Sequence, residues 1–187
     1  VLTVSRHEAH MDEHPDSQRG VTLIEAAVAM TLVAIAVSTA VPGFQGLVAR
    51  KRVEGVATQL ATDLQTVRTT AVARNEPLRI SFHAAPGGTC YVIHTGAKLQ
   101  CSCVGPAPAA CLDGAEQIRT VWLPATELVT VQASAGSILF DPLHCTSTPT
   151  GTVRVSGTPG AIHHVVNVMG RVRSCSPDGV LPGYRPC

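Results

Sequence analysis

The sequence predicts an α+β fold in which a long bent N-terminal helix packs on an antiparallel β-sheet. Three patterns along its 187 residues indicate this class. The run from Val21 to Val41 is largely apolar and carries a single charge, on Glu25. Apolar residues recur at steps of three and four from Gln45 to Asn75, and short β-type runs fill the chain from Leu78 onward. We therefore expect a helix whose first half is transmembrane and whose second half lies on the sheet.

The apolar run predicts a transmembrane helix over residues 21–42. At a rise of about 1.5 Å per residue, a helix of this length covers the hydrocarbon core of a bilayer. A carboxylate there costs about 2.5–3.5 kcal/mol on insertion scales, and such residues are usually functional and have a partner. Glu25 is therefore a candidate functional residue, and the chain divides into a leader (1–20), the helix (21–42) and a domain (43–187).

The leader precedes the apolar run directly, ending at Arg19-Gly20. A secretory signal peptide has its cleavage site after the apolar stretch, so this order is different. Cleavage between Gly20 and Val21 would keep the anchor and leave a new amine four residues before Glu25. In lipid the amine and the carboxylate are each unfavourable, but they neutralise one another across subunits. The alternative is an ordinary signal anchor with an isolated glutamate.

The segment G-VTLIE at residues 20–25 resembles the prepilin cleavage motif of type IV pilins and type II secretion pseudopilins. Pro42 also lies where pilin helices commonly carry a proline. The resemblance implies cleavage after Gly20 by a prepilin peptidase, N-methylation of Val21 and a role for Glu25 in subunit assembly. Two features depart from the pattern: the first mature residue is Val rather than Phe, and the leader is acidic and contains histidine.

Two further segments resemble the GspH/FimT group of minor pilins: RTTAVARNEPLRISF at 68–82 and GRVRSC at 170–175. This resemblance implies a type IV pilin-like fold and a structural subunit of a type II secretion pseudopilus or a type IV pilus. It also implies other pilin subunits and an inner-membrane assembly platform as partners, and a place near the filament tip. The segment from 84 to 150 contributes little to the resemblance.

Two observations disagree about the side of the membrane on which the domain lies. Arg50, Lys51 and Arg52 follow the apolar run, whereas Arg6 and Arg19 precede it, so the positive-inside rule favours a cytoplasmic C-terminus. All seven cysteines follow the run, which favours an oxidising compartment such as a periplasm. Because the basic residues differ by only one, we expect a single-pass protein of the bacterial inner membrane with a periplasmic C-terminal domain.

The domain is expected to begin with the second half of the helix, which ends at about residue 75, before Pro77. Its apolar stripe comprises Val53, Val56, Leu60, Leu64, Val67 and Ala71, with Asp63 on another face. Six strands of one sheet are expected at 78–83, 89–94, 119–123, 137–140, 151–156 and 161–168. The segment 101–114 is expected to be an irregular loop held by cysteines.

The cysteines allow two kinds of site. Cys175 and Cys187 bracket a Pro/Gly-rich tail, and a bridge between them would stabilise the domain by about 2–4 kcal/mol. Cys101, Cys103 and Cys111 have a spacing compatible with zinc, although disulfides are favoured in an oxidising compartment. We therefore expect no metal, and at least one cysteine is free or bonded to another chain.

Arg171 and Arg173 are the candidate binding residues. In a strand, residues two apart lie on one face about 6.6 Å apart, a spacing similar to that of successive phosphates along one nucleic-acid strand. If Met169-Gly170-Arg171 forms a three-residue turn with a left-handed glycine, Val172 pairs with Val168 and both arginines face solvent.

These arginines have two interpretations. In the first, they form a solvated edge that discourages strand-to-strand aggregation. In the second, they bind DNA without reading its sequence; the Gly-Arg-x-Arg motif is associated with DNA capture in FimT-type minor pilins, which this tail resembles. From Gly151 onward four arginines are opposed by Asp178 alone, which gives a mildly cationic C-terminal part.

No nucleophile elbow or phosphate-binding loop is present in the sequence. His163 and His164 are adjacent in a predicted strand, so they point to opposite faces and cannot chelate one ion together. We therefore expect a protein that is not an enzyme and has no cofactor.

Overall fold

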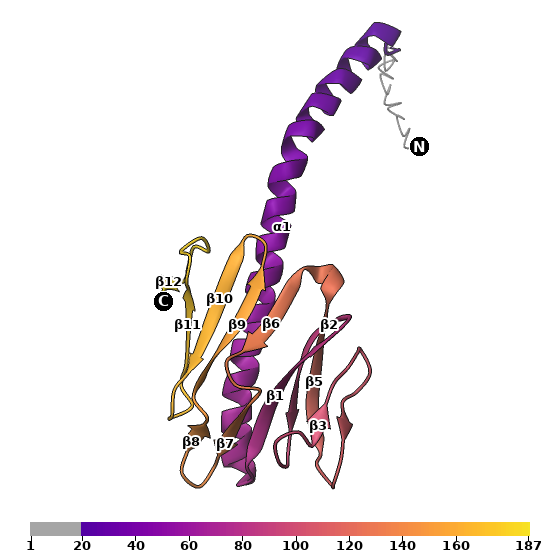
Figure 1. Ribbon diagram of the computed structural model, residues 1–187. Coiled ribbons are helices and arrows are strands. Elements are labelled where there is room, and N and C mark those ends of the chain that lie inside the picture. Colours follow the sequence, from indigo (N-terminus) through magenta and orange to yellow (C-terminus); the bar gives the residue numbers. More distant parts are fainter. Residues whose placement is uncertain (1–19) are drawn as a thin grey trace, which may run out of the picture. The chain divides into compact units, whose positions relative to one another are not determined.

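The computed structural model describes residues 20–187 and confirms the α+β class. One helix, α1 (Leu23–Arg74), is followed by β-strands and one short 3-10 helix, η1 (Ala125–Glu127) (Figure 1). The chain divides between Val41 and Pro42 into two units, which are described separately below. Apart from Gly20, the predicted leader lies outside the described residues.

The second unit contains two five-stranded sheets and a two-stranded ribbon, rather than the single predicted sheet. The first sheet has the order β5-β2-β1-β7-β8 and comprises β1 (Leu78–Ala85), β2 (Gly88–His94), β5 (Gln117–Pro124), β7 (Ser137–Asp141) and β8 (Thr146–Thr148). The second has the order β12-β11-β10-β9-β6 and comprises β6 (Val129–Ala133), β9 (Gly151–Gly157), β10 (Gly160–Val166), β11 (Val172–Ser176) and β12 (Arg185–Pro186). The ribbon of β3 (Cys101–Ser102) and β4 (Ala110–Cys111) lies in the segment predicted as an irregular loop.

The second sheet arises because β6, which the sequence analysis missed, pairs with β9. Leu128 adopts a left-handed conformation (φ 58°) after η1, so the chain turns away from β5 before β6 begins. Val129 and Val131 of β6 then face the core, opposite Gly157 and Val155 of β9. Strand pairing is antiparallel in both sheets except between β11 and β12, which are parallel.

Residues 42–74 of α1 bury one stripe against both sheets. The predicted stripe is fully buried except for Val56, which is partly buried, and Ala57 extends it. The same core contains Ile80, Tyr91 and Phe140 of the first sheet and Val153, Val155, Ile162 and Val166 of the second. The helix ends at Arg74, where Asn75 takes a left-handed conformation (φ 52°) and the Glu76 amide donates to the Ala71 carbonyl (3.1 Å). One helix therefore joins the two sheets through a common core.

Asp63 corrects the sequence analysis, because it lies in the interface between α1 and the first sheet. Its side chain is 3% exposed, accepts a hydrogen bond from the Tyr91 hydroxyl (2.7 Å) and pairs with Arg119 Nη1 (2.9 Å). Burial, together with the hydrogen bond to Asp63, raises the pKa of the Tyr91 phenol above its ordinary value. A buried carboxylate is tolerated only when it is paired in this way, so Asp63 fixes the position of α1 against β2 and β5.

His164 is the second buried polar group that faces the helix. It lies on the core side of β10, 1% exposed, and its Nδ1 is 2.9 Å from Ser174 Oγ on β11. Burial lowers its pKa from 6.5 to about 4, an effect partly offset by the backbone of Ala57 in α1. His163, the next residue, points to the other face and is partly exposed, as expected from strand alternation.

We predict that the domain loses stability as the pH falls from about 6.5 to about 4. The unfolded chain binds a proton at His164 in this range and the folded chain does not, so the free energy of unfolding falls, by about 3 kcal/mol at most. Burial also lowers the pKa of His94, which adds to the loss. Denaturant titrations followed by the fluorescence of Trp122, the single tryptophan, measure this change. His164→Gln should remove the His164 part of the pH dependence and leave the part due to His94; an unchanged profile would contradict this account.

Candidate assembly and binding sites

The first unit contains an apolar helical segment whose side chains are exposed. Gly20 and Val21 precede α1, and Val21 is 72% exposed. Among the described residues, α1 is the one helix long and apolar enough to cross a membrane, judged by length and composition, and none of its most apolar window is buried. Exposed apolar residues of this segment include Leu23, Ile24, Val28, Met30, Leu32, Val33, Ile35, Val37 and Val41. A surface of this kind needs a bilayer or other apolar helices around it.

Glu25 lies in the first turn of α1, where Thr22 caps the helix. The Glu25 amide donates a hydrogen bond to Thr22 Oγ1 (3.3 Å). Thr22-Leu23-Ile24-Glu25 matches the Ser/Thr-x-x-Glu pattern of a capping box, a signal that our sequence analysis did not use. Within residues 20–187 the Glu25 carboxylate forms no ion pair and no side-chain hydrogen bond. The acidic group at this end is also favoured by the helix dipole.

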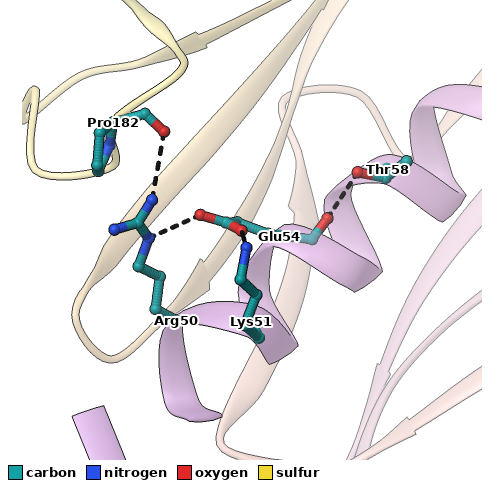
Figure 2. A network of polar contacts seen from close by, with 5 residues as sticks. All are labelled: Arg50, Lys51, Glu54, Thr58 and Pro182. Carbon is teal, nitrogen blue, oxygen red and sulfur yellow. Dashed lines mark hydrogen bonds and ion pairs between the residues drawn. The ribbon is translucent and has the colours of Figure 1, made fainter. Parts of the chain in front are cut away.

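Two of the three basic residues after the anchor have a local acidic partner. Figure 2 shows Glu54 accepting from Arg50 Nε and from Lys51 Nζ, both at 2.7 Å, and Arg50 Nη2 reaching the Pro182 carbonyl at 3.5 Å. The hydrogen bonds from Lys51 and Arg50 lower the pKa of the Glu54 carboxyl. This network links α1 to the chain segment before β12.

The turn before β11 differs from the predicted one. Val172 pairs with Val166 rather than with Val168, and the Asn167 amide donates to the Arg171 carbonyl (3.1 Å), so the three-residue tip is 168–170, one residue earlier than predicted. The carbonyls of Asn167 and Val168 also accept hydrogen bonds from the Ser147 hydroxyl (2.6 Å) and the Ser147 amide (2.7 Å). Gly170 has the predicted left-handed conformation (φ 68°).

Arg171 and Arg173 line different cavities. Arg171 lies before β11, its amide donates to Asn167 Oδ1 (2.9 Å), and it lines a cavity of about 310 Å³ with Arg68 of α1. A side chain at Gly170 would come within 3.0 Å of the Arg68 side chain, so glycine lets Arg68 approach the turn. Arg173 lies in β11 and lines a cavity of about 410 Å³ with Arg185. That both arginines share one strand face stays a prediction.

Arg173 belongs to the outer face of the second sheet. We call this surface the cationic face, and it comprises Arg154, His163, Val165, Arg173 and Arg185. Arg154, His163, Cys175 and Arg185 form one cross-strand row on β9, β10, β11 and β12. Val165 and Arg173 form part of the adjacent row on the same face. Burial and the charge of Arg154 lower the pKa of His163, while Asp178 opposes the shift.

Six of the seven cysteines form disulfides: Cys90–Cys103, Cys101–Cys111 and Cys175–Cys187. Cys90–Cys103 ties the chain directly after β3 to β2, and Cys101–Cys111 joins β3 to β4; the buried Cys90, Cys101 and Cys103 pack with Val92. The sulfur atoms considered for zinc are therefore in disulfides. Among the described residues no group of three or more His, Cys, Asp or Glu side chains is placed to hold a metal ion.

Two family models match the chain. The model described as type II transport protein GspH matches residues 56–170, more than half of the chain. The model described as the prokaryotic N-terminal methylation motif matches residues 15–41. Comparisons with curated proteins and with solved structures found no match. The two matched segments cover the anchor and most of the domain.

We predict that thiol labelling of the denatured protein without reductant modifies one cysteine, Cys145, which is the exposed free thiol. Reduction should raise the number of labelled thiols to seven, the cysteine count of the chain. Intact-mass measurement gives the count, and the Cys145→Ser variant, which should remain unlabelled without reductant, is the control. Three or more labelled thiols before reduction would show that a bridge is missing.

Proposed function

This chain belongs to the family of type II transport protein GspH, a minor pilin or pseudopilin, and we propose that it acts as a non-enzymatic subunit of a type II secretion pseudopilus or a type IV pilus. The observation that carries the proposal is the exposed apolar segment of α1, which begins two residues after the methylation-motif site at Val21 and carries one charge, on Glu25. The exposed apolar side chains of this segment need an apolar environment, which a bilayer supplies first and neighbouring helices of the filament supply later.

In this proposal, prepilin peptidase removes residues 1–20 and Val21 is methylated. Residues 21–42 then hold the subunit in the bacterial inner membrane, with residues 43–187 in the periplasm, until an assembly platform moves it into the filament. The disulfides support the periplasmic side, because they form and persist in oxidising compartments. A place near the filament tip follows from the resemblance to minor pilins alone.

Glu25 would guide assembly by charge pairing. Once the leader is removed, the amine of Val21 in one subunit is a suitable partner for Glu25 in its neighbour, because each charge is unfavourable alone in lipid. The lack of an ion-pair partner for Glu25 within the described chain supports this role. The helix dipole, which favours an acidic group in the first turn, offers a purely structural alternative.

A second candidate function is DNA binding by the domain, as part of DNA uptake. Arg171 and Arg173 are both exposed, and neither guanidinium group has an ion-pair or hydrogen-bond partner within residues 20–187; the Asn167 side chain contacts only the Arg171 backbone amide. Contacts of this kind bind phosphates and not bases, so we expect weak binding without sequence preference that falls as salt rises.

We predict processing between Gly20 and Val21. Mass spectrometry of the membrane-extracted protein should find a chain that begins at methylated Val21, and Gly20→Glu should leave the precursor in the membrane. An intact leader in the parent protein, or a cut beyond Val41, would contradict the pilin interpretation.

We predict that Glu25→Ala inserts into the membrane as well as the parent, since a costly charge is lost, but enters filaments several-fold less. Glu25→Gln is the matched control, because glutamine keeps the size and polarity of the side chain but carries no charge. Both variants should be defective when filaments are sheared and quantified by immunoblot. Normal incorporation of Glu25→Gln would reject charge pairing.

A further inference from the structure

The first sheet has an open edge at β5, which pairs with β2 on one side only. The Ala125 amide donates to the Gly87 carbonyl (2.9 Å), which marks one hydrogen-bonded pair of this ladder. Because such pairs alternate along an antiparallel ladder, the backbone amides and carbonyls of Thr120 and Trp122 point away from β2. Within residues 20–187 they have no hydrogen-bond partner. The edge therefore offers unpaired donors and acceptors to an added strand.

The other edge strands of the two sheets are short or closed. β8 and β12 have three and two residues, and β6 has five, with its open-side Val131 amide donating to the Thr89 hydroxyl (3.0 Å). β5 has eight residues, its proline, Pro124, stands at the end, and its one charged side chain, Arg119, contacts α1. Natural proteins usually protect an exposed edge by short length, proline or outward charge. β5 has little of this protection, so its edge is suited to pairing.

A groove of about 560 Å³ lies between α1 and β5. We call it the β5 groove. Arg119 lines it from β5, and α1 lines it from Lys51 and Glu54 at one end to Asp63 at the other. The α1 residues between these ends are uncharged and small or polar: Gly55, Thr58, Gln59 and Thr62. Since successive side chains of a strand point to opposite faces, a strand added to β5 would place every second side chain toward this groove.

Both ends of the β5 groove present a cation to solvent. The Lys51 side chain is 65% exposed and its acceptor Glu54 17%, while Arg119 is 48% exposed and its partner Asp63 3%. Arg119 uses Nη1 for Asp63, which leaves its other N–H donors for a further acceptor. Lys51 and Asp63 are twelve residues apart on α1, which is about 18 Å along the helix. An extended peptide covers this length in about five to six residues.

We infer that the β5 groove binds an extended, acidic segment of a partner protein, which adds to β5 as an antiparallel strand. Backbone hydrogen bonds to Thr120 and Trp122 supply the pairing, and carboxylates at the two ends of the segment contact Lys51 and Arg119. A second copy of β5 is a poor occupant, because its one charged side chain is an arginine and cation would meet cation. The inference goes beyond the filament proposal, since it assigns a partner to a surface of the domain.

The experiment uses the full processed chain in a nonionic detergent and a labelled peptide with blocked ends, Glu-Val-Thr-Val-Thr-Val-Glu. In an extended strand its glutamates and threonines share the face toward the groove, and its valines lie on the other face beside Thr120 and Trp122. Fluorescence anisotropy measures the affinity, and the emission of Trp122, the single tryptophan, reports binding at β5. We expect saturable binding that shifts the Trp122 emission and weakens as salt rises.

N-methylated peptides test whether the ligand adds as a strand. In an antiparallel strand the residues opposite Thr120 and Trp122 turn their amides toward β5, and in this peptide they are valines. Methylation of the central valine amide should weaken binding about tenfold or more, because a hydrogen bond is lost and a carbonyl of β5 is left unpaired. Methylation of a threonine amide, the matched control, should leave the affinity unchanged, because that amide faces solvent.

Charge changes test the two ends of the groove. Lys51→Gln should weaken binding about two- to fivefold, which is the contribution of an exposed ion pair, whereas Arg154→Gln on the cationic face, the matched control, should not. The Arg119 end is tested from the peptide, because removal of Arg119 would leave Asp63 buried without its cation. A peptide with glutamine in place of both glutamates should bind more weakly than the parent peptide and should not respond to Lys51→Gln.

Four results would overturn the inference. They are no binding of the glutamate peptide, equal binding of the two methylated peptides, equal binding of the glutamine peptide, and self-association of the parent protein that the peptide dissociates. The last result would assign the edge of β5 to a second copy of the chain. The filament proposal would stand in each case, because processing at Gly20 and the Glu25 variants test it separately.

Discussion

The domain depends on the burial of one stripe of α1 against two sheets at once. Leu60 and Leu64, with Val53 and Val67, fill a core whose other side is built from strands of both sheets. Burying each of these side chains contributes about 1.5–3 kcal/mol, so the helix stripe links the two sheets through one core. Asp63 also fixes the position of the helix, because its buried carboxylate is tolerated only where the Tyr91 hydroxyl and the Arg119 guanidinium contact it.

The charged side chains of this protein fall into two groups, those with a partner of opposite charge and those without one. Several basic groups of α1 and the first sheet have partners: Arg50 and Lys51 contact Glu54 (Figure 2), and Arg119 contacts Asp63. On the outer face of the second sheet Arg154, Arg173 and Arg185 have none in the described part of the chain. Paired groups hold the fold together, whereas unpaired ones keep their charge available for a ligand or for solubility. The same division applies to Glu25, whose carboxylate has no partner in the described chain.

The two units suit two stages in the life of a filament subunit. The apolar segment of α1 is stable only in a bilayer or among other helices, whereas residues 42–187 have a core of their own and three disulfides. In the proposed transfer from membrane to filament, the domain would stay folded while the surroundings of its anchor change. The Cys101–Cys111 and Cys175–Cys187 disulfides tie down the short strands β3, β4 and β12.

Sequence alone determined the features that depend on local pattern. The leader-before-anchor order, Glu25 in the apolar run, the stripe on α1 and strands β1, β2, β5, β7, β9 and β10 all follow from residue spacing. Tertiary structure decided what depends on long-range pairing. Periodicity placed Asp63 off the apolar stripe, but it carries no information about Tyr91 and Arg119, and it could not show that β6 joins β9 instead of β5. Residue spacing relates Arg173 only to near neighbours such as Arg171, whereas the pairing of β9, β10, β11 and β12 brings it onto one sheet face with Arg154 and Arg185.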